Sequence, residues 1–172
     1  DTPAGQRRIR IPDEAGLQVH ARGTVRQEPT FHVKHGQGRM IADKITEMGD
    51  NLRLLEGHDR LHYLIDKAKD MEPLPEAAKI DDNRIRGCAS KLWIIGGAKE
   101  DGTMMYQVDG DAHISKGTAK IVTDIVNGEP KNEVADLTVE SFTPLGIKEL
   151  LTMQRQNGLG ELINRIIRIA HD

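Results

Sequence analysis

The chain has 172 residues, 37% of them apolar, which is enough for one domain with a hydrophobic core of ordinary size. Its net charge is −3, but residues 1–39 hold seven basic and four acidic side chains, so residues 40–172 carry −6. That sign disfavours nucleic acid as a partner, and the sequence has no apolar run long enough to span a membrane. We therefore predict a cytoplasmic protein with no nucleic-acid partner and no membrane partner.

A single cysteine and seven scattered histidines limit the chemistry that this chain could hold alone. One cysteine excludes an internal disulfide, and zinc ribbons and iron-sulfur clusters normally require several thiolates. His58 and His62 have the i,i+4 spacing of helical metal ligands, but no glutamate follows the first of them as it does in zinc-protease motifs. We predict no metal and no cofactor in this chain.

Residues 1–39 contain Gly, Pro, Arg, Gln and His without a sustained apolar period. We interpret them as a flexible N-terminal arm that is either a leader or an artificial extension, with Met40 as a candidate natural start. Their excess of arginine over acidic residues is typical of transit peptides, so import into an organelle stays an open alternative. The predicted domain comprises residues 40–172.

The first part of this domain has the pattern of two helices. Asp43 suits an N-cap, and apolar residues then recur at helical spacing up to Leu55. A second apolar stripe runs from Leu61 to Ala68 and must end before Pro73. We expect these two helices to pack on each other as a hairpin.

The middle of the chain has the pattern of strands. Short apolar runs at residues 92–95 and 104–108 flank the turn-prone pair Asp101-Gly102 and predict a β-hairpin or a small antiparallel sheet.

The last part of the chain is again helical in pattern. Asp111 offers the N-cap of a third long helix, which should end near Asn127. A short helical stretch at residues 142–151 precedes a final helix with an apolar stripe over residues 159–170. The predicted fold class is α+β, with a small antiparallel β-sheet packed against several helices.

Cys88 falls between predicted strands, and its immediate neighbours are glycine, alanine and serine, which have almost no side-chain bulk. Another molecule could therefore approach its sulfur closely. The thiolate is the nucleophilic form, and a thiol with the ordinary pKa of about 8.5 needs help from nearby positive charge or from its partner to ionise at neutral pH. Arg84 and Arg86 are the local candidates for that charge.

Local composition leaves two other interpretations of Cys88 open. Free cysteines are most often small buried hydrophobes, and composition alone favours this inert role. The enzymatic alternative is a Cys-dependent hydrolase or transferase acting on a small substrate, with His113 or His62 as its base.

The residues around Cys88 resemble the sulfur-acceptor signature of the SufE family. That signature has an apolar residue, any residue, Gly-Cys, any residue, Ser and then an apolar-Trp pair, and residues 85–93 match it in register. Further blocks resemble the family in the same order, at residues 60–75, 109–117 and 151–159. Residues 57–60 and Met153-Gln154 depart from the family's pattern.

The resemblance implies a SufE/IscU-like fold and a function in iron-sulfur cluster assembly. A cysteine desulfurase of the SufS or CsdA kind, which carries pyridoxal phosphate, would pass persulfide sulfur to Cys88. Cys88 would then deliver the sulfur to a scaffold such as SufBCD. In the family, the cysteine loop packs against an apolar pocket and moves out to meet its partner. The protein would stimulate the desulfurase and would not be an enzyme by itself.

Other matching positions are candidates for partner docking or loop support, and they are Arg86, Gly87, Ser90, Asp111, Lys116 and Arg155. Gly87 is expected to be a flexible point and Asp111 a helix cap. We expect Trp93 in the core of the sheet, because large aromatic side chains are mostly buried.

Overall fold

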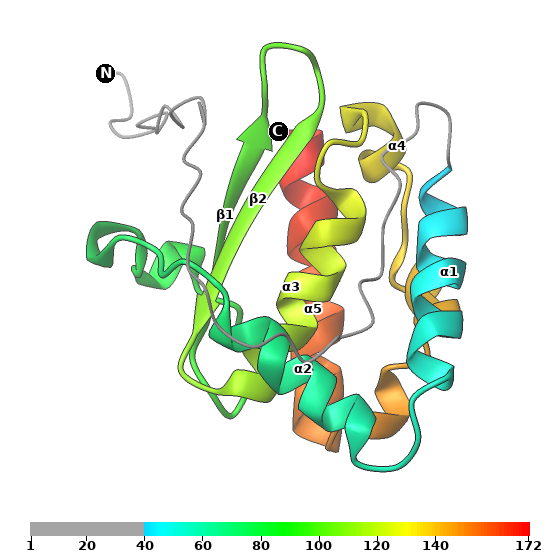
Figure 1. The fold of residues 1–172 in the computed structure, drawn as a ribbon. Helices are drawn as coiled ribbons and strands as arrows, with labels where there is room; N and C mark the ends of the chain where they lie inside the picture. The colour runs from blue at the N-terminus through cyan, green and yellow to red at the C-terminus, as the bar shows by residue number, and fades with distance from the viewer. Residues whose placement is uncertain (1–39) are drawn as a thin grey trace, which may run out of the picture. The chain divides into compact units, whose positions relative to one another are not determined.

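The computed structural model describes residues 40–172, and the predictions made for residues 1–39 lie outside them. Two strands and five α-helices follow one another along the chain (Figure 1), with short 3-10 helices between them. The strands and α-helices are α1 (Ile41–Arg53), α2 (Asp59–Lys69), β1 (Leu92–Ala98), β2 (Met104–Gly110), α3 (His113–Val126), α4 (Lys131–Ala135) and α5 (Met153–His171). The 3-10 helices are η1 (Glu76–Ala78), η2 (Asp81–Asn83), η3 (Val139–Leu145) and η4 (Lys148–Leu150).

The two strands form the predicted antiparallel hairpin, in which Leu92 pairs with Gly110 and Ala98 with Met104. Side chains alternate between the two faces of a strand, and one face of this hairpin packs into the core along most of its length. The buried side chains on that face are Leu92, Ile94, Met104, Tyr106 and Val108. This small sheet among several helices confirms the predicted α+β class.

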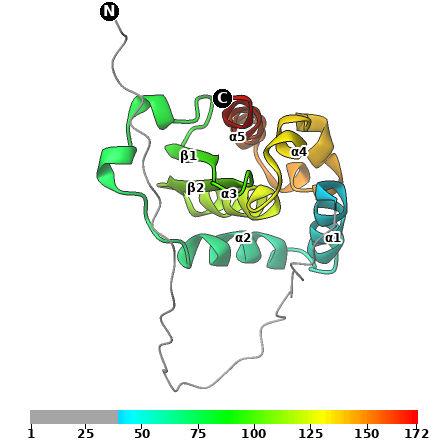
Figure 2. The ribbon, with the colours of Figure 1, turned by 90° about the horizontal axis from the view of Figure 1, so that it is seen from above.

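The helices are arranged differently from the predicted hairpin of α1 and α2. Instead of lying along each other, α2 packs on α3, and α1 packs on η3 and α3 (Figure 2). Gly117 permits the close approach of α2 and α3, since a Cβ at this position would lie 1.8 Å from the carbonyl oxygen of Leu64. The two helices thus meet backbone against backbone, which the apolar stripes alone could not indicate.

Helix α3 begins at His113 with Ala112 as its N-cap and without a side-chain cap, so the prediction that Asp111 caps this helix is wrong. The Asp111 carboxylate instead accepts a hydrogen bond of 2.9 Å from the backbone N–H of Lys91. Helix α1 likewise has Met40, and not Asp43, as its N-cap.

Tyr106 connects three parts of the fold. Its hydroxyl donates a hydrogen bond of 2.8 Å to the backbone oxygen of Ile166 in α5. Its backbone N–H and C=O bond to the side chain of Asn127, at the end of α3, over 2.7 and 3.1 Å. Burial raises the pKa of the Tyr106 hydroxyl far above its usual value, so it stays protonated and able to donate. Strand β2, α3 and α5 are therefore fixed to one another.

Asp109, which is 4% exposed, is the centre of a buried ionic group. Its carboxylate lies 3.2 Å from the ammonium groups of both Lys79 and Lys116, and it accepts hydrogen bonds from the N–H groups of Leu74 (3.0 Å) and Gly110 (2.8 Å). Burial alone would raise the pKa of Asp109, but these hydrogen bonds outweigh it and the pKa is lowered. This Asp109 cluster fixes the segment after α2 to β2 and α3.

No helix within residues 40–172 is both long enough and apolar enough to cross a membrane.

Candidate functional site

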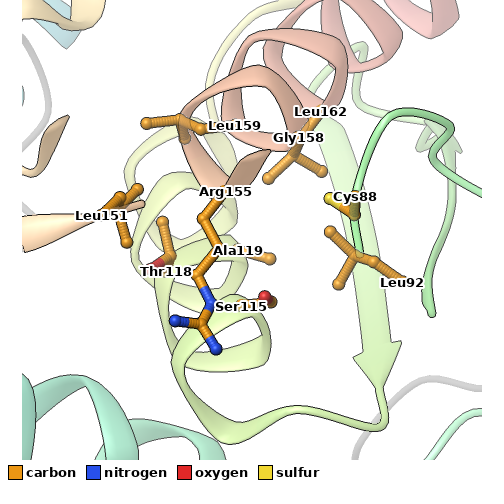
Figure 3. A pocket seen from close by; sticks show the side chains of 10 residues that line it. All are labelled: Cys88, Leu92, Ser115, Thr118, Ala119, Leu151, Arg155, Gly158, Leu159 and Leu162. Carbon is orange, nitrogen blue, oxygen red and sulfur yellow. The ribbon is translucent and has the colours of Figure 1, made fainter. Parts of the chain in front are cut away.

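Cys88 lies in the connection between η2 and β1, in a stretch of residues 86–90 that we call the Cys88 loop. Its side chain is half-buried, and its sulfur points into a small pocket between the loop, α3 and α5 (Figure 3). The pocket leaves about 10 Å³ for the centre of a water-sized sphere, which is room for roughly one water molecule. Its lining residues are Cys88, Leu92, Ser115, Thr118, Ala119, Leu151, Arg155, Gly158, Leu159 and Leu162.

Gly158 in α5 is a close neighbour of the thiol. A Cβ at this position would lie 1.8 Å from Cys88 Sγ, far inside van der Waals contact. The sulfur therefore packs directly against the helix backbone, in space that any other residue type would fill. The sequence offered one signal for this residue, its place in the block at residues 151–159, but nothing there connected it to Cys88.

The Cys88 loop is held by hydrogen bonds at its C-terminal end. Ser90 donates a hydrogen bond of 3.0 Å from its hydroxyl to Ser115 Oγ in α3, and Lys91 exchanges hydrogen bonds with Asp111. Gly87 has a φ of +89°, in the region that favours glycine. In the part of the chain that the structure describes, Gly87, Cys88 and Ala89 make no hydrogen bond to another helix or strand. Ser90 thus ties the loop to α3, and Asp111 holds the residue that follows the loop, while a role of either residue in partner docking stays a prediction.

Burial is the largest influence on the Cys88 thiol and raises its pKa, while the positive charges of Arg155 and then Arg84 lower it in part. In this conformation the thiol is protonated at neutral pH. Of the two local arginines, only Arg84 acts on the thiol. Arg86 is 69% exposed, lies 3.5 Å from the carboxylate of Asp81 and is not among the causes of the shift.

Arg155 lies in the first turns of α5, and its side chain extends across the pocket that also holds Cys88 (Figure 3). Among residues 40–172, no side chain or carbonyl pairs with its guanidinium group. An unpaired guanidinium that lines the same pocket as the sulfur is suited to receive an anion. Arg155 therefore belongs to the candidate site together with Cys88.

The remaining predicted residues do not join the pocket. Lys116 belongs to the Asp109 cluster, where its side chain is 15% exposed, so it is a structural residue. Trp93 is half-buried and lies outside the core, so the prediction that it belongs to the core is wrong. Side chains alternate along a strand, and its neighbours Leu92 and Ile94 face the core, so Trp93 faces the other side. The ammonium of Lys79 lies 5.9 Å from the centre of its ring.

The structure gives no support to a Cys-His pair. His113 and His62 are both exposed, and neither lines the pocket of Cys88. Among residues 40–172 there is also no group of three or more His, Cys, Asp or Glu side chains that could hold a metal ion.

Comparison with known proteins places the whole domain, including the pocket, in one family. Residues 46–170 match the family model SufE, described as an Fe-S metabolism associated domain. A SufE-like protein of Rhizobium etli is 33% identical over 133 residues, covering 74% of this chain and 90% of that protein. SufE-like protein 2, chloroplastic, of Arabidopsis thaliana is 31% identical over 119 residues, covering 69% of this chain and 46% of that protein.

The fold has a match among solved structures. The solution structure of a hypothetical protein from Thermus thermophilus aligns with a TM-score of 0.63 at 18% identity, covering 74% of this chain and 93% of that one. At this identity the likeness concerns the fold alone. The relatives include a bacterial and a chloroplast protein, so the cytoplasmic location stays a prediction.

Proposed function

This chain belongs to the SufE family and has a role in iron-sulfur metabolism, and we propose that Cys88 performs it by accepting sulfur from a cysteine desulfurase. The observation that carries the proposal is the place of the chain's single cysteine, whose thiol enters a small pocket beside the unpaired guanidinium of Arg155. The desulfurase, of the SufS or CsdA kind, would supply the pyridoxal phosphate.

The transfer is an exchange between sulfur atoms. The Cys88 thiolate attacks the terminal sulfur of the persulfide on the desulfurase and forms a new S–S bond. The bond between that sulfur and the desulfurase cysteine breaks, and the electron pair leaves with the desulfurase cysteine as a thiolate. The transferred sulfur keeps its proton, so no external oxidant or reductant is required.

Two features of the loop fit this exchange. The attacking sulfur must align with the S–S bond that breaks, which a thiol packed against α5 cannot do. The Cys88 loop must therefore open toward the partner, and its centre has no hydrogen bonds to other described residues that would prevent this. Release from the pocket also removes the burial that raises the pKa of the thiol, so the thiolate forms where it is needed.

The pocket fits the product of the exchange. Persulfides are readily attacked by small thiols and by oxidants. The free space beside Cys88, about 10 Å³ for the centre of a water-sized sphere, suits one additional atom of the size of sulfur, and the lining is mostly apolar. A returned loop would shield the persulfide, and Arg155 would face its negative charge. The sulfur would then pass to a cluster scaffold of the SufBCD kind.

The test is incubation of the protein with a cysteine desulfurase and free cysteine, followed by mass spectrometry. We expect a gain of one sulfur atom on the peptide that contains Cys88, removable by a reductant, and faster turnover of the desulfurase. Cys88→Ser should lose both effects. Absence of the added sulfur, or full stimulation of the desulfurase by Cys88→Ser, would contradict the proposal.

A further inference from the structure

We propose that Gly158 is the positioning residue that keeps the Cys88 loop closed, because its missing side chain creates the space that the thiol occupies. Closed here means the conformation with Sγ in the pocket. The consequence for sulfur transfer rests on the proposed function, whereas the positioning itself concerns only this chain.

The geometry confines the conflict to one atom. A Cβ on residue 158 would lie 1.8 Å from Cys88 Sγ but 3.3 Å from its Cβ and 3.7 Å from its Cα. The last two distances are tight or ordinary contacts that small shifts can relieve. The first is an overlap, and it ends only when the sulfur leaves its place. An alanine at position 158 is thus incompatible with the closed thiol and compatible with the rest of the loop.

Cys88, and not the helix, will move to relieve this overlap, by rotation of its side chain or by displacement of the loop, and either movement takes Sγ out of the pocket. Helix α5 is 19 residues long, and the side chains on its inner face are buried in the core, among them Leu159 and Leu162. The loop is joined to α3 only through the hydroxyl of Ser90, and residues 87–89 make no hydrogen bond to any helix or strand of the described chain. Displacing a core helix is costlier than displacing such a loop.

Gly158 therefore sets the ratio of closed to open loop. A small alkylating reagent reaches the thiol in the open conformation, so its rate is proportional to the open fraction. Overpacking of this kind shifts an equilibrium by roughly tenfold or more. In the proposed sulfur transfer, a larger open fraction would speed the reaction of Cys88 with the desulfurase. It would also shorten the lifetime of the Cys88 persulfide, because small thiols would reach it more often.

The experiment compares Gly158→Ala with Gly160→Ala, two substitutions in the same helix. A Cβ at Gly160 meets nothing within 4 Å, so this variant is the matched control. We expect iodoacetamide to alkylate Cys88 about tenfold faster in Gly158→Ala, and the pKa from the rate profile to fall. Gly160→Ala should match the wild type. Equal rates and equal pH profiles in the two variants would overturn the proposal.

A double-mutant cycle with Cys88→Ala, measured by thermal unfolding, covers the case in which Gly158→Ala folds poorly. Removing Sγ removes the overlapping atom, so Gly158→Ala should lower Tm by roughly 4 °C or more with Cys88 and by much less with alanine at 88. The same loss in both backgrounds would refute the role of the sulfur. Neither measurement contains a desulfurase, so a failed persulfide assay with a positive alkylation result would refute the relay alone.

Discussion

The connection between α2 and β1 is held firmly in its first half and loosely in its second. Leu74 and Lys79 bond to the buried carboxylate of Asp109, which also binds Lys116. The Cys88 loop follows on the same connection, and the side-chain interactions described for it are a hydrogen bond from Ser90 to Ser115 and an exposed ion pair of Arg86 with Asp81. This difference shows how a reactive loop can move without unfolding the domain, since the Asp109 cluster fixes the chain that leads into it.

Asp109→Ala should have the largest effect on the free energy of unfolding, because it removes the centre of the Asp109 cluster. Lys116 and the N–H groups of Leu74 and Gly110 would lose their partner in a buried place, and we expect a loss of about 2–4 kcal/mol in the free energy of unfolding. Asp66→Ala, which removes an exposed ion pair with Lys69, should change it by less than about 0.5 kcal/mol. Urea unfolding measures both, and similar values would remove the contrast between the two halves.

The same carboxylate predicts how stability depends on pH. Because the pKa of Asp109 is lower in the folded protein than in the unfolded chain, its contribution is present above about pH 4 and is lost as the pH falls through the folded value. The difference in unfolding free energy between wild type and Asp109→Asn should therefore be constant from about pH 7 to 5 and shrink below about pH 4. A difference that stays unchanged in acid would show that the carboxylate is not stabilised by folding.

Ser115→Ala tests how the Cys88 loop is held, since it removes the acceptor of the hydrogen bond from Ser90. We expect alkylation of Cys88 to become roughly two- to tenfold faster, because the free energy of one ordinary hydrogen bond changes an equilibrium by about that factor. The free energy of global unfolding should change little. Ser141→Ala is the control, because that hydroxyl bonds to Thr138 at the start of η3 and lies outside the pocket. An unchanged rate in Ser115→Ala would leave Gly158 as the residue that controls the loop.

The sequence predicted the elements better than their contacts. The hairpin and the helices could be read from apolar spacing, because burial of one face produces a period of 2 or of 3.6 residues. The packing of α2 on α3 could not be read, since it depends on the close backbone approach at Gly117. Asp111 was misread as a cap because an aspartate before a helix fits that pattern, whereas its carboxylate binds the N–H of Lys91.

Prediction of the candidate site from the sequence was limited in the same way, to single residues without their contacts. Cys88 could be chosen because it is the only cysteine and lies in a family signature, but spacing could not show which charges surround it. Local reasoning named Arg84 and Arg86, and the fold leaves Arg86 on the surface and brings Arg155 from α5. Residues distant in sequence meet only through tertiary packing, which also explains why Gly158 could not be connected to the thiol.

The contrast between Arg155 and Arg86 gives the smallest predicted effect. The positive charge of Arg155 lowers the pKa of the Cys88 thiol against the larger effect of burial, so Arg155→Ala should raise that pKa. Fewer thiolates form at a given pH, and alkylation near pH 8 should be roughly two- to fivefold slower. Arg86→Ala should match the wild type, because Arg86 pairs with Asp81 at the surface. Arg155→Lys keeps the charge and should recover part of the rate, whereas a faster reaction in Arg155→Ala would mean that this side chain mainly covers the pocket.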